Sequence, residues 1–260
     1  MREKLIAVEE DFAVIDESDD WIVVDKPAPL IVHPTNNYKP EPTLIGGVES
    51  LLAYEMINGA RLSIINRLDR ETSGLVIIAK NRTAARALCR AMERRQVEKN
   101  YDVIVFGWPE WESRFVDAPI LRKGEITPSP IWVKQMVHDE GKACSTGFEV
   151  VGRAIVGEVK VTHLKAKPHT GRMHQIRVHA AHLGHPLVGD KIYGADETCY
   201  LRFIETGWTK ELQQALLMPR QALHASGMKV LLDDGELQWS TGLAADMRSF
   251  LDGKPCLGLS

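Results

Sequence analysis

The sequence of 260 residues lacks the patterns that mark membrane proteins and cofactor-binding enzymes. No apolar run approaches the ~18 residues that a membrane span requires. Neither GxGxxG nor GxxxxGK[ST], the loops that bind nucleotide cofactors, occurs in the chain. The start of the chain, MREKLIAVEEDF, has acidic residues where a signal peptide would have its apolar core. We therefore expect a cytoplasmic protein with no membrane contact and no small-molecule cofactor.

Cysteine is scarce, and the cysteines lie far apart without a CxxC pair: Cys89, Cys144, Cys199 and Cys256. This spacing suits a reducing compartment and argues against a disulfide framework or a cysteine zinc site. A histidine site is the other metal alternative, because residues 167–194 contain five histidines. His179 and His182 could share a helix face, but there is no HExxH pattern and no acid inside the histidine run. We expect no metal, and keep a histidine-based metal hydrolase as the weaker hypothesis.

An excess of positive charge is also missing, since the formal net charge is −3. The charge is nevertheless unevenly spread. Residues 1–20 hold eight acids and two bases, whereas residues 80–99 hold seven bases and two acids. Residues 160–191 contain six Lys or Arg, six histidines and a single acid, Asp190. A mildly acidic protein can therefore still present a basic face to a polyanion.

Hydrophobic periodicity predicts strands with helices inserted between them and no βαβ rhythm. The expected strands are 21–25, 62–65, 75–79, 101–106, 114–121, 131–137, 143–151, 156–166, 222–232 and 236–240. The expected helices are 43–57, 82–95, 174–183, 196–206, 209–217 and 243–251, and residues 34–43 are expected to form a loop. This order indicates the α+β class, with a mixed, mainly antiparallel sheet and flanking helices in a single domain.

Arginines recur at every fourth position of the helix expected over 82–95, for which Asn81 is a good N-cap. They are Arg82, Arg86, Arg90 and Arg94, and the i, i+4 spacing puts them on one stripe. The stripe is either a solvated face or a surface that follows phosphates.

A single carboxylate, Asp69, lies between Arg67 and Arg70, just before the apolar strand at 75–79. Burial alone would make a carboxylate take up a proton, but a nearby cation keeps it ionised. Asp69 is therefore suited to be a nucleophile or an electrostatic stabiliser. The alternative is an ordinary loop aspartate in a salt bridge.

A second polar stretch, KPHTGRMHQIRVHAAHLGHPLVGDKIYG, covers residues 167–194. Lys167, Arg172, Arg177 and the histidines could line a cleft that contacts a polyanion. A helix that begins near Met173 would add its N-terminal amide groups.

The two stretches together resemble the RluA-type RNA pseudouridine synthases. NRLDRETSGLVII is similar to the family's HRLDxxTSGLLL motif, with Asn66 in place of the usual histidine. GRMHQIRVHAAHLGHPLVGDKIYG is similar to its GRxHQIRVHxxxxGxPxxGDxxYG block. Lys99–Tyr101 and Leu223–Ala225 match the KxY and LHA elements between and after them. The motifs stand in family order over roughly residues 20–240.

The resemblance implies the pseudouridine synthase fold and an isomerase that converts specific uridines in ribosomal or transfer RNA to pseudouridine. Asp69 would be the nucleophile on a flipped-out nucleotide, attacking either the ribose or the base. Arg177 would pair with Asp69, and Tyr101 would stack on the base. Arg67 would fill the gap that the flipped nucleotide leaves. Tyr101 and Arg177 could instead be a core residue and a surface residue.

The remaining expectations concern RNA binding and domain organisation. The expected RNA contacts are Arg67, Arg70, Arg172, His174, Gln175, Arg86, Arg90 and Lys167. Leu223 is expected either to line the uracil pocket or to be core. Residues 1–20 would be an acidic extension, and residues 21–260 a catalytic domain without a separate N-terminal RNA-binding domain. We expect a monomer, and the competing hypothesis is a catalytically inactive RNA-binding protein of the same fold.

Overall fold

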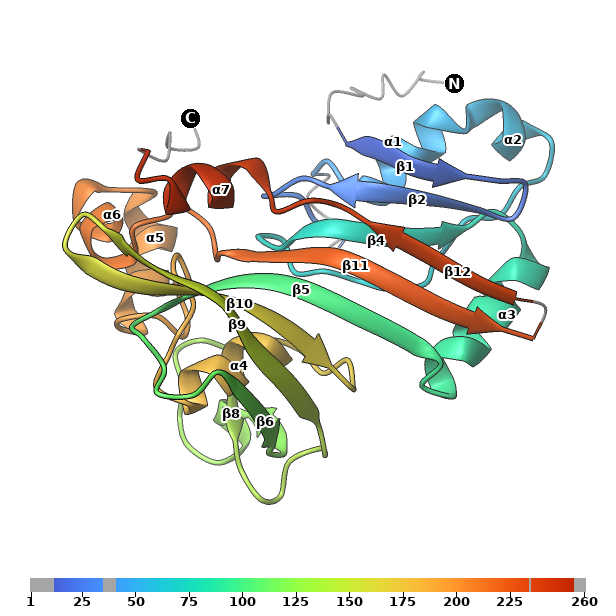
Figure 1. The fold of residues 1–260 in the computed structure, drawn as a ribbon. Helices are drawn as coiled ribbons and strands as arrows, with labels where there is room; N and C mark the ends of the chain where they lie inside the picture. The colour runs from blue at the N-terminus through green and yellow to red at the C-terminus, as the bar shows by residue number, and fades with distance from the viewer. Residues whose placement is uncertain (1–11, 35–40, 234, 255–260) are drawn as a thin grey trace. The chain divides into compact units, whose positions relative to one another are not determined.

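A computed structural model describes residues 12–34, 41–233 and 235–254 of the chain (Figure 1). The contacts divide the chain into two compact units. Unit 1 contains residues 1–97 and 228–241, and unit 2 contains residues 98–227 and 242–260. None of the described helices is long and apolar enough to cross a membrane.

Unit 1 is built on antiparallel strands in the order β1–β2–β4. β1 is Ala13–Glu17, β2 is Trp21–Lys26 and β4 is Ser73–Ala79. The short β3 (Ser63–Ile64) pairs with β4, and β12 (Gly235–Ser240) pairs with β11 (Leu223–Leu232). Its helices are α1 (Leu44–Leu51), α2 (Ala53–Ile57) and α3 (Arg82–Glu93).

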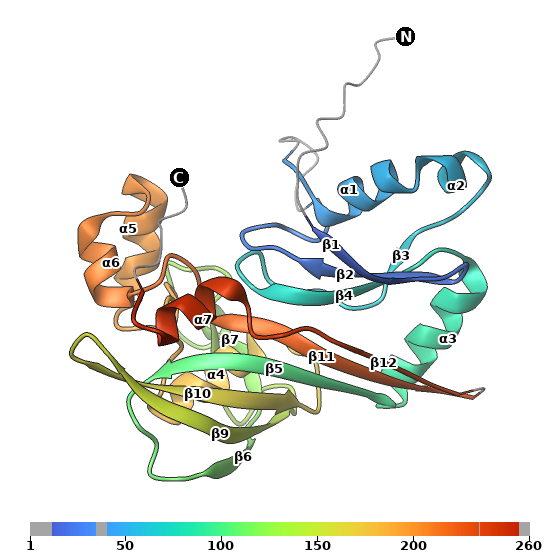
Figure 2. The same cartoon turned by 45° about the horizontal axis from the view of Figure 1, so that its top comes forward.

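Both faces of the β2 and β4 strands in unit 1 are buried, because alternate residues of a strand point to opposite faces. One face packs against α1 through Ile22, Val24, Val76, Ile78, Leu44 and Val48. The other packs against α3 through Val23, Leu75, Ile77, Ala84, Leu88 and Ala91. In Figure 2, α1 and α3 are accordingly seen on opposite sides of these strands. Such two-sided burial explains why β4 is an uninterrupted apolar run.

Unit 2 contains antiparallel strands in the order β5–β10–β9–β6. These strands are β5 (Val97–Phe106), β6 (Ser113–Asp117), β9 (Ser145–Val156) and β10 (Val159–Pro168). β7 (Ile120–Arg122) and β8 (Gln135–Val137) form a separate two-stranded sheet, with a 3₁₀ turn at Lys123–Glu125.

The helices of unit 2 are α4 (Gln175–His182), α5 (Thr198–Thr206), α6 (Lys210–Leu216) and α7 (Ala245–Leu251). α5 and α6 lie side by side and bury Cys199, Leu212 and Leu216 between them (Figure 1). Val178 of α4 packs with Ile120 and Ile131 from the β7–β8 region. The β7–β8 hairpin is therefore attached to the helix that carries Arg177.

The predicted fold class, α+β with a mainly antiparallel sheet, is confirmed. The single strand predicted over 114–121 is instead β6 and β7, which are separated at Pro119, and the strand predicted over 131–137 is reduced to β8. Proline has no amide to donate, so it interrupts the ladder. β1 lies inside the predicted acidic extension and pairs with β2. The predicted domain boundaries stay a prediction.

Candidate functional site

Asp69 lies in the connection between β3 and β4 of unit 1, where it is half-buried. The amide of Thr72 donates to the carbonyl of Asp69 at 3.1 Å, which closes a tight turn before β4. Asn66 attaches this connection to β4: its side-chain amide donates to the Leu75 carbonyl at 3.0 Å and accepts from the Ile77 amide at 2.9 Å. The buried Asn66 thus acts as a short strand partner that holds the Asp69 turn in place.

The two arginines on either side of Asp69 are exposed, and each has a partner within unit 1. Arg67 Nη1 lies 3.4 Å from His33 Nε2, and Arg70 Nη2 lies 2.5 Å from Glu41 Oε2. The exposed Arg70–Glu41 ion pair contributes about 1 kcal/mol or less, and the Arg67–His33 contact is a long hydrogen bond between two basic side chains. Breaking either contact therefore costs little free energy.

Lys26 is a buried lysine that sequence reasoning did not select, although it belongs to the Lys-Pro-Ala-Pro segment after β2. Its Nζ donates to the carbonyls of Pro27 and Leu30, both at 2.8 Å, and of Arg70 at 3.2 Å. The Leu30 amide donates to the same Arg70 carbonyl at 3.0 Å. Lys26 therefore ties the segment after β2 to the residue that follows Asp69.

Lys26→Met is expected to lower the free energy of unfolding by about 2–4 kcal/mol, because it leaves three carbonyls without a charged donor. The measurement is urea unfolding followed by circular dichroism. Lys80→Met is the matched control, since Lys80 is also buried in unit 1 but its ammonium group contacts a single side chain among the described residues, the half-exposed Glu17 at 2.9 Å. Equal effects of the two substitutions would contradict a special role for Lys26.

The predicted N-cap and arginine stripe of α3 are confirmed as structural features. The Asn81 side chain accepts from the Ala84 amide at 2.9 Å, and Arg82, Arg86, Arg90 and Arg94 are all exposed. Within the described part of the chain, Arg86 and Arg90 have no carboxylate within 4 Å, whereas Arg94 lies 3.9 Å from Asp233. Successive arginines of the stripe are about 6 Å apart along the helix axis.

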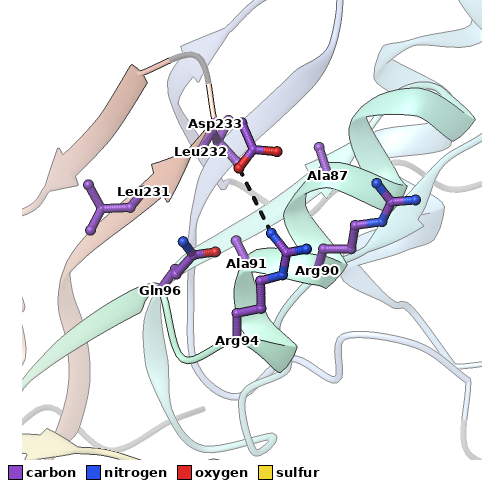
Figure 3. Close-up of a pocket in the computed structure, with 8 residues that line it drawn as sticks. All are labelled: Ala87, Arg90, Ala91, Arg94, Gln96, Leu231, Leu232 and Asp233. Carbon is purple, nitrogen blue, oxygen red and sulfur yellow. Dashed lines mark ion pairs between the residues drawn. The ribbon is translucent and has the colours of Figure 1, made fainter.

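A groove of about 320 Å³ lies beside the C-terminal half of α3 in unit 1 (Figure 3). Its lining residues are Ala87, Arg90, Ala91, Arg94, Gln96, Leu231, Leu232 and Asp233. Because the neighbouring alanines are small, the aliphatic parts of the Arg90 and Arg94 side chains are exposed on the helix surface. The stripe therefore borders a concave surface.

In unit 2, Tyr101 is a buried residue of β5 opposite Ala166 of β10. Leu223 is buried at the start of β11. Lys99, from the same KxY element, lies against the loop after β10, since a Cβ on Gly171 would be 3.5 Å from its Nζ. Burial lowers the pKa of Lys99. The KxY strand thus carries both a buried ring and a partly desolvated amine.

Arg177 is buried on α4 and makes a two-point ion pair with Asp190. Its Nε lies 2.6 Å from Asp190 Oδ2, and its Nη2 lies 2.9 Å from Asp190 Oδ1. Asp190 Oδ1 also accepts from the amides of Ile192 and Tyr193, at 2.9 and 3.0 Å. Burial alone would raise the pKa of Asp190, but Arg177 and these amides outweigh burial and hold it below its usual range.

Asp190 can occupy this buried position because Gly189 precedes it. Gly189 has φ +77°, and a Cβ there would lie 1.8 Å from the Arg220 carbonyl oxygen. Only glycine fits this turn. Because Arg177 is buried, the alternative that it is a surface arginine of a helix is wrong. Its guanidinium group has a carboxylate partner, Asp190, within unit 2.

Tyr193 joins α4 to the β7–β8 hairpin. Its hydroxyl accepts from the Gln135 amide at 2.8 Å and lies 2.9 Å from His174 Nδ1. The guanidinium carbon of Arg177 lies 5.1 Å from the centre of the Tyr193 ring. Tyr193 therefore positions His174 and lies beside Arg177.

The predicted RNA contacts of this region divide into exposed and buried side chains. Lys167 and Arg172 are exposed. Gln175 is buried, and its amide donates to the Ser145 carbonyl at 2.9 Å while its oxygen accepts from Thr170 Oγ1 at 2.6 Å. Its polar atoms are thus occupied within unit 2, which favours a structural role over the predicted RNA contact. α4 begins at Gln175 with His174 as its N-cap, close to the predicted start near Met173.

The metal alternative finds no support in the placement of the histidines. His179 is buried, with Nδ1 2.9 Å from Thr146 Oγ1 and Nε2 2.9 Å from the Ala118 carbonyl. Both ring nitrogens are therefore occupied, and burial lowers the pKa of His179. No group of three metal-ligating side chains occurs among the residues that the structure describes.

The predicted site residues fall in both units. Asp69, Arg67, Arg70, Arg86 and Arg90 belong to unit 1, and the other predicted residues belong to unit 2. The pairing of Arg177 with Asp69 stays a prediction. Sequence reasoning missed the positioning residues Lys26, Asp190 and Tyr193. The available signals were the Lys-Pro dipeptide for Lys26 and, for Asp190 and Tyr193, their positions as the D and Y of the GDxxYG part of the second motif.

Residues 20–182 match the family model described as RNA pseudouridylate synthase. An uncharacterized RNA pseudouridine synthase of Aquifex aeolicus is 40% identical over 182 residues, 70% of this chain and 55% of that protein. The ribosomal large subunit pseudouridine synthase D of Pseudomonas aeruginosa is 36% identical over 85% of this chain and 64% of its own length. The protein of that name from Escherichia coli K12 is 32% identical over 92% and 69%.

Two solved human structures are similar in fold. RNA Pseudouridylate Synthase Domain Containing 1 gives a TM-score of 0.68 at 24% identity, covering 90% of this chain and 84% of that one. RNA Pseudouridylate Synthase Domain Containing 4 gives 0.68 at 21% identity, with 92% of each chain covered. The chain spans less than two thirds of the A. aeolicus and P. aeruginosa relatives.

Proposed function

Because the chain belongs to the RluA-type RNA pseudouridine synthase family, we propose that it is an isomerase that converts uridine in RNA to pseudouridine. The observation that best supports this proposal is the position of Asp69, inside the matched residues 20–182. Asp69 lies in a turn before β4 that Asn66 and Lys26 hold in place. A carboxylate that performs chemistry must be held in a defined position, and two buried side chains provide this.

The proposed reaction conserves all atoms. The bond between N1 of uracil and C1′ of the ribose breaks, a bond between C5 and C1′ forms, C5 loses a proton, and N1 gains one. No redox step or group donor is needed. Asp69 would act as the nucleophile that loosens uracil from its first linkage, by attack at either the ribose or the base.

The supporting roles follow from chemistry and position. Tyr101 offers a ring for stacking on the uracil and a hydroxyl that can take part in removal of the C5 proton. Leu223 offers an apolar surface to the base. Arg177 would stabilise the ionised Asp69, and its own position is supported by Asp190 at 2.6 Å. A base within a stacked helix cannot reach a carboxylate, so the target uridine would be flipped out.

Ribosomal RNA is the substrate that we propose first, because two of the relatives are named ribosomal large subunit pseudouridine synthase D. Transfer RNA is the second substrate class. A cytoplasmic location belongs to the same proposal and fits the free cysteines Cys89, Cys144 and Cys199. Arg67, Arg70, Arg172, His174 and Lys167 would contact the RNA near the reacting nucleotide.

The proposal is tested by tritium release from RNA that carries tritium at C5 of uridine. Purified protein is incubated separately with large-subunit ribosomal RNA transcripts and with total transfer RNA. Release of tritium to water from either RNA is the expected result. Absence of release from both RNAs, with tight RNA binding intact, would favour the competing hypothesis of a non-catalytic RNA-binding protein.

The α3 stripe would add sequence-independent affinity through phosphate contacts. Replacing both Arg86 and Arg90 with glutamine is expected to weaken RNA binding and to reduce the slope of log K against log salt by about 1.4, or 0.7 per lost contact with a single strand. Fluorescence anisotropy between 50 and about 300 mM salt measures this slope. Arg61→Gln/Arg248→Gln, with the same charge change at exposed positions, is the control. An unchanged slope would make the stripe a solvated face.

A further inference from the structure

Trp132 is an exposed aromatic residue in the connection between β7 and β8 of unit 2. Its exposed fraction is 77%, whereas the preceding residue, Ile131, is 1% exposed. Ile131 packs with Ile120 of β7 and Val178 of α4, so this buried residue fixes the connection to the rest of unit 2. The amide of Lys134 also donates to the Ile131 carbonyl at 3.1 Å. Trp132 is thus held outward by an ordered loop.

Arg122 covers one side of the Trp132 ring. The guanidinium carbon lies 3.7 Å from the ring centre, and Arg122 Nε lies 3.4 Å from Glu125 Oε1, which restrains the guanidinium. With one face of the ring occupied and most of the side chain exposed, the opposite face is open to solvent. The result is a two-layer stack with a free aromatic surface.

The stack is connected to the predicted site residues of unit 2 through the β8 strand. Arg122 is the antiparallel partner of Gln135. The Gln135 amide donates to the Tyr193 hydroxyl at 2.8 Å, and its side-chain Nε2 lies 3.6 Å from the sulfur of Met173. Tyr193 in turn lies 2.9 Å from His174 Nδ1. Met173 and His174 therefore contact the hairpin through Gln135 and Tyr193, and Arg122 is the cross-strand partner of the same Gln135.

We propose that the open face of Trp132 stacks on an unpaired base of the RNA substrate other than the target uridine. The inference rests on the proposed function and adds a contact that helps to select the RNA. RNA readers bind splayed bases by stacking them on aromatic rings and arginine planes. Such stacking is tolerant of base identity, so Trp132 would select for an unpaired position and not for a particular base.

The chemistry around Trp132 favours RNA over a protein partner. A protein interface requires an apolar centre of fully buried side chains, with about 800 Å² covered on each partner. Here a single exposed ring stacks on Arg122, and the two lysines of the hairpin, Lys123 and Lys134, both pair with Glu197, at 3.1 and 2.7 Å. One flat ring backed by a guanidinium plane matches an unstacked base.

The test combines Trp132 variants with abasic substitutions in the RNA. The probe is a hairpin fragment of large-subunit ribosomal RNA that releases tritium with wild-type protein, with each unpaired position other than the target made abasic in turn. Wild type is expected to lose affinity about ten-fold or more at one position. Trp132→Ala should lose the same factor on intact RNA and show no further loss at that position. Trp132→Phe, which keeps a ring, should stay within about three-fold of wild type.

Trp108→Ala is the matched control, because Trp108 is a partly exposed tryptophan of unit 2 with Lys160 4.7 Å from its ring centre. Trp108→Ala should bind the intact RNA hairpin with the affinity of wild type. Two results would overturn the inference: equal RNA affinity of Trp132→Ala and wild type, or the same loss of affinity at the abasic position in Trp132→Ala as in wild type. Either result would favour a protein partner for the exposed ring. No tritium release by wild type would instead overturn the proposed function, independently of Trp132.

Discussion

Asp69→Asn is expected to abolish tritium release from C5-labelled RNA, with a loss of at least about 10⁴-fold in rate. Asparagine has nearly the same shape as aspartate but provides no anionic nucleophile. The turn should persist, because Asn66 and Lys26 hold it through the Leu75 and Arg70 carbonyls, which the substitution leaves in place. RNA affinity measured by anisotropy is therefore expected to stay within a few fold of wild type.

The control for this substitution is Asp19→Asn, the same change at an exposed aspartate of unit 1. Asp19→Asn should release tritium at the wild-type rate. Two results would contradict the assignment of Asp69 as nucleophile. One is substantial release by Asp69→Asn, and the other is a loss of release that is explained by a loss of folded protein in circular dichroism.

Arg177→Met is expected to lower the free energy of unfolding by about 3–5 kcal/mol, because it leaves the Asp190 carboxylate buried without its counter-ion. For a chain of this size the melting temperature should fall by roughly 6–20 °C. Catalytic activity should also be lost. On its own, this variant cannot separate a structural role of Arg177 from a role at the reacting nucleotide.

A double variant, Arg177→Met/Asp190→Asn, separates the two roles. It removes both charges of the pair, while the asparagine oxygen can still accept from the Ile192 and Tyr193 amides. Most of the lost stability should return, since burying two neutral groups avoids the uncompensated charge. Activity should remain at the level of the single variant if the guanidinium acts on Asp69. Recovery of activity together with stability would make Arg177 a purely structural residue.

The pH dependence of unfolding provides a second check on the same pair. Asp190 has a pKa below its usual range in the folded protein. Its stabilising contribution is therefore complete above the unfolded value of about 3.9 and is lost as the pH falls through the lower folded value. Below about pH 4, the free energy of unfolding of wild type should fall more steeply than that of the double variant.

Local signals predicted much of this fold. The N-cap Asn81, the helix after it and the uninterrupted strand before it depend on neighbours within a few residues, and the structure contains all three. β1 was not predicted, because AVIDE is too polar and short to stand out, and its pairing with β2 supplies the missing stabilisation. The division between β6 and β7 could have been expected from Pro119.

Partners far apart in sequence could not be predicted. The resemblance proposed a partner for Arg177, but nothing in the spacing indicated that Asp190, 13 residues later, would be buried against it. Lys26 is similar, because one of its acceptors belongs to Arg70, 44 residues later, and all three are main-chain carbonyls, which any residue type provides. Buried polar networks are thus the part of the site that requires three-dimensional structure.

Asn66 has a consequence for the chemical robustness of the turn that carries Asp69. Its side-chain Nδ2 donates to the Leu75 carbonyl while its Oδ1 accepts from the Ile77 amide. A histidine could provide one donor and one acceptor only as the neutral imidazole, and protonation would convert the acceptor into a second donor. A carboxamide has no such equilibrium. The attachment of this turn to β4 is therefore insensitive to acidification through the range in which histidine titrates.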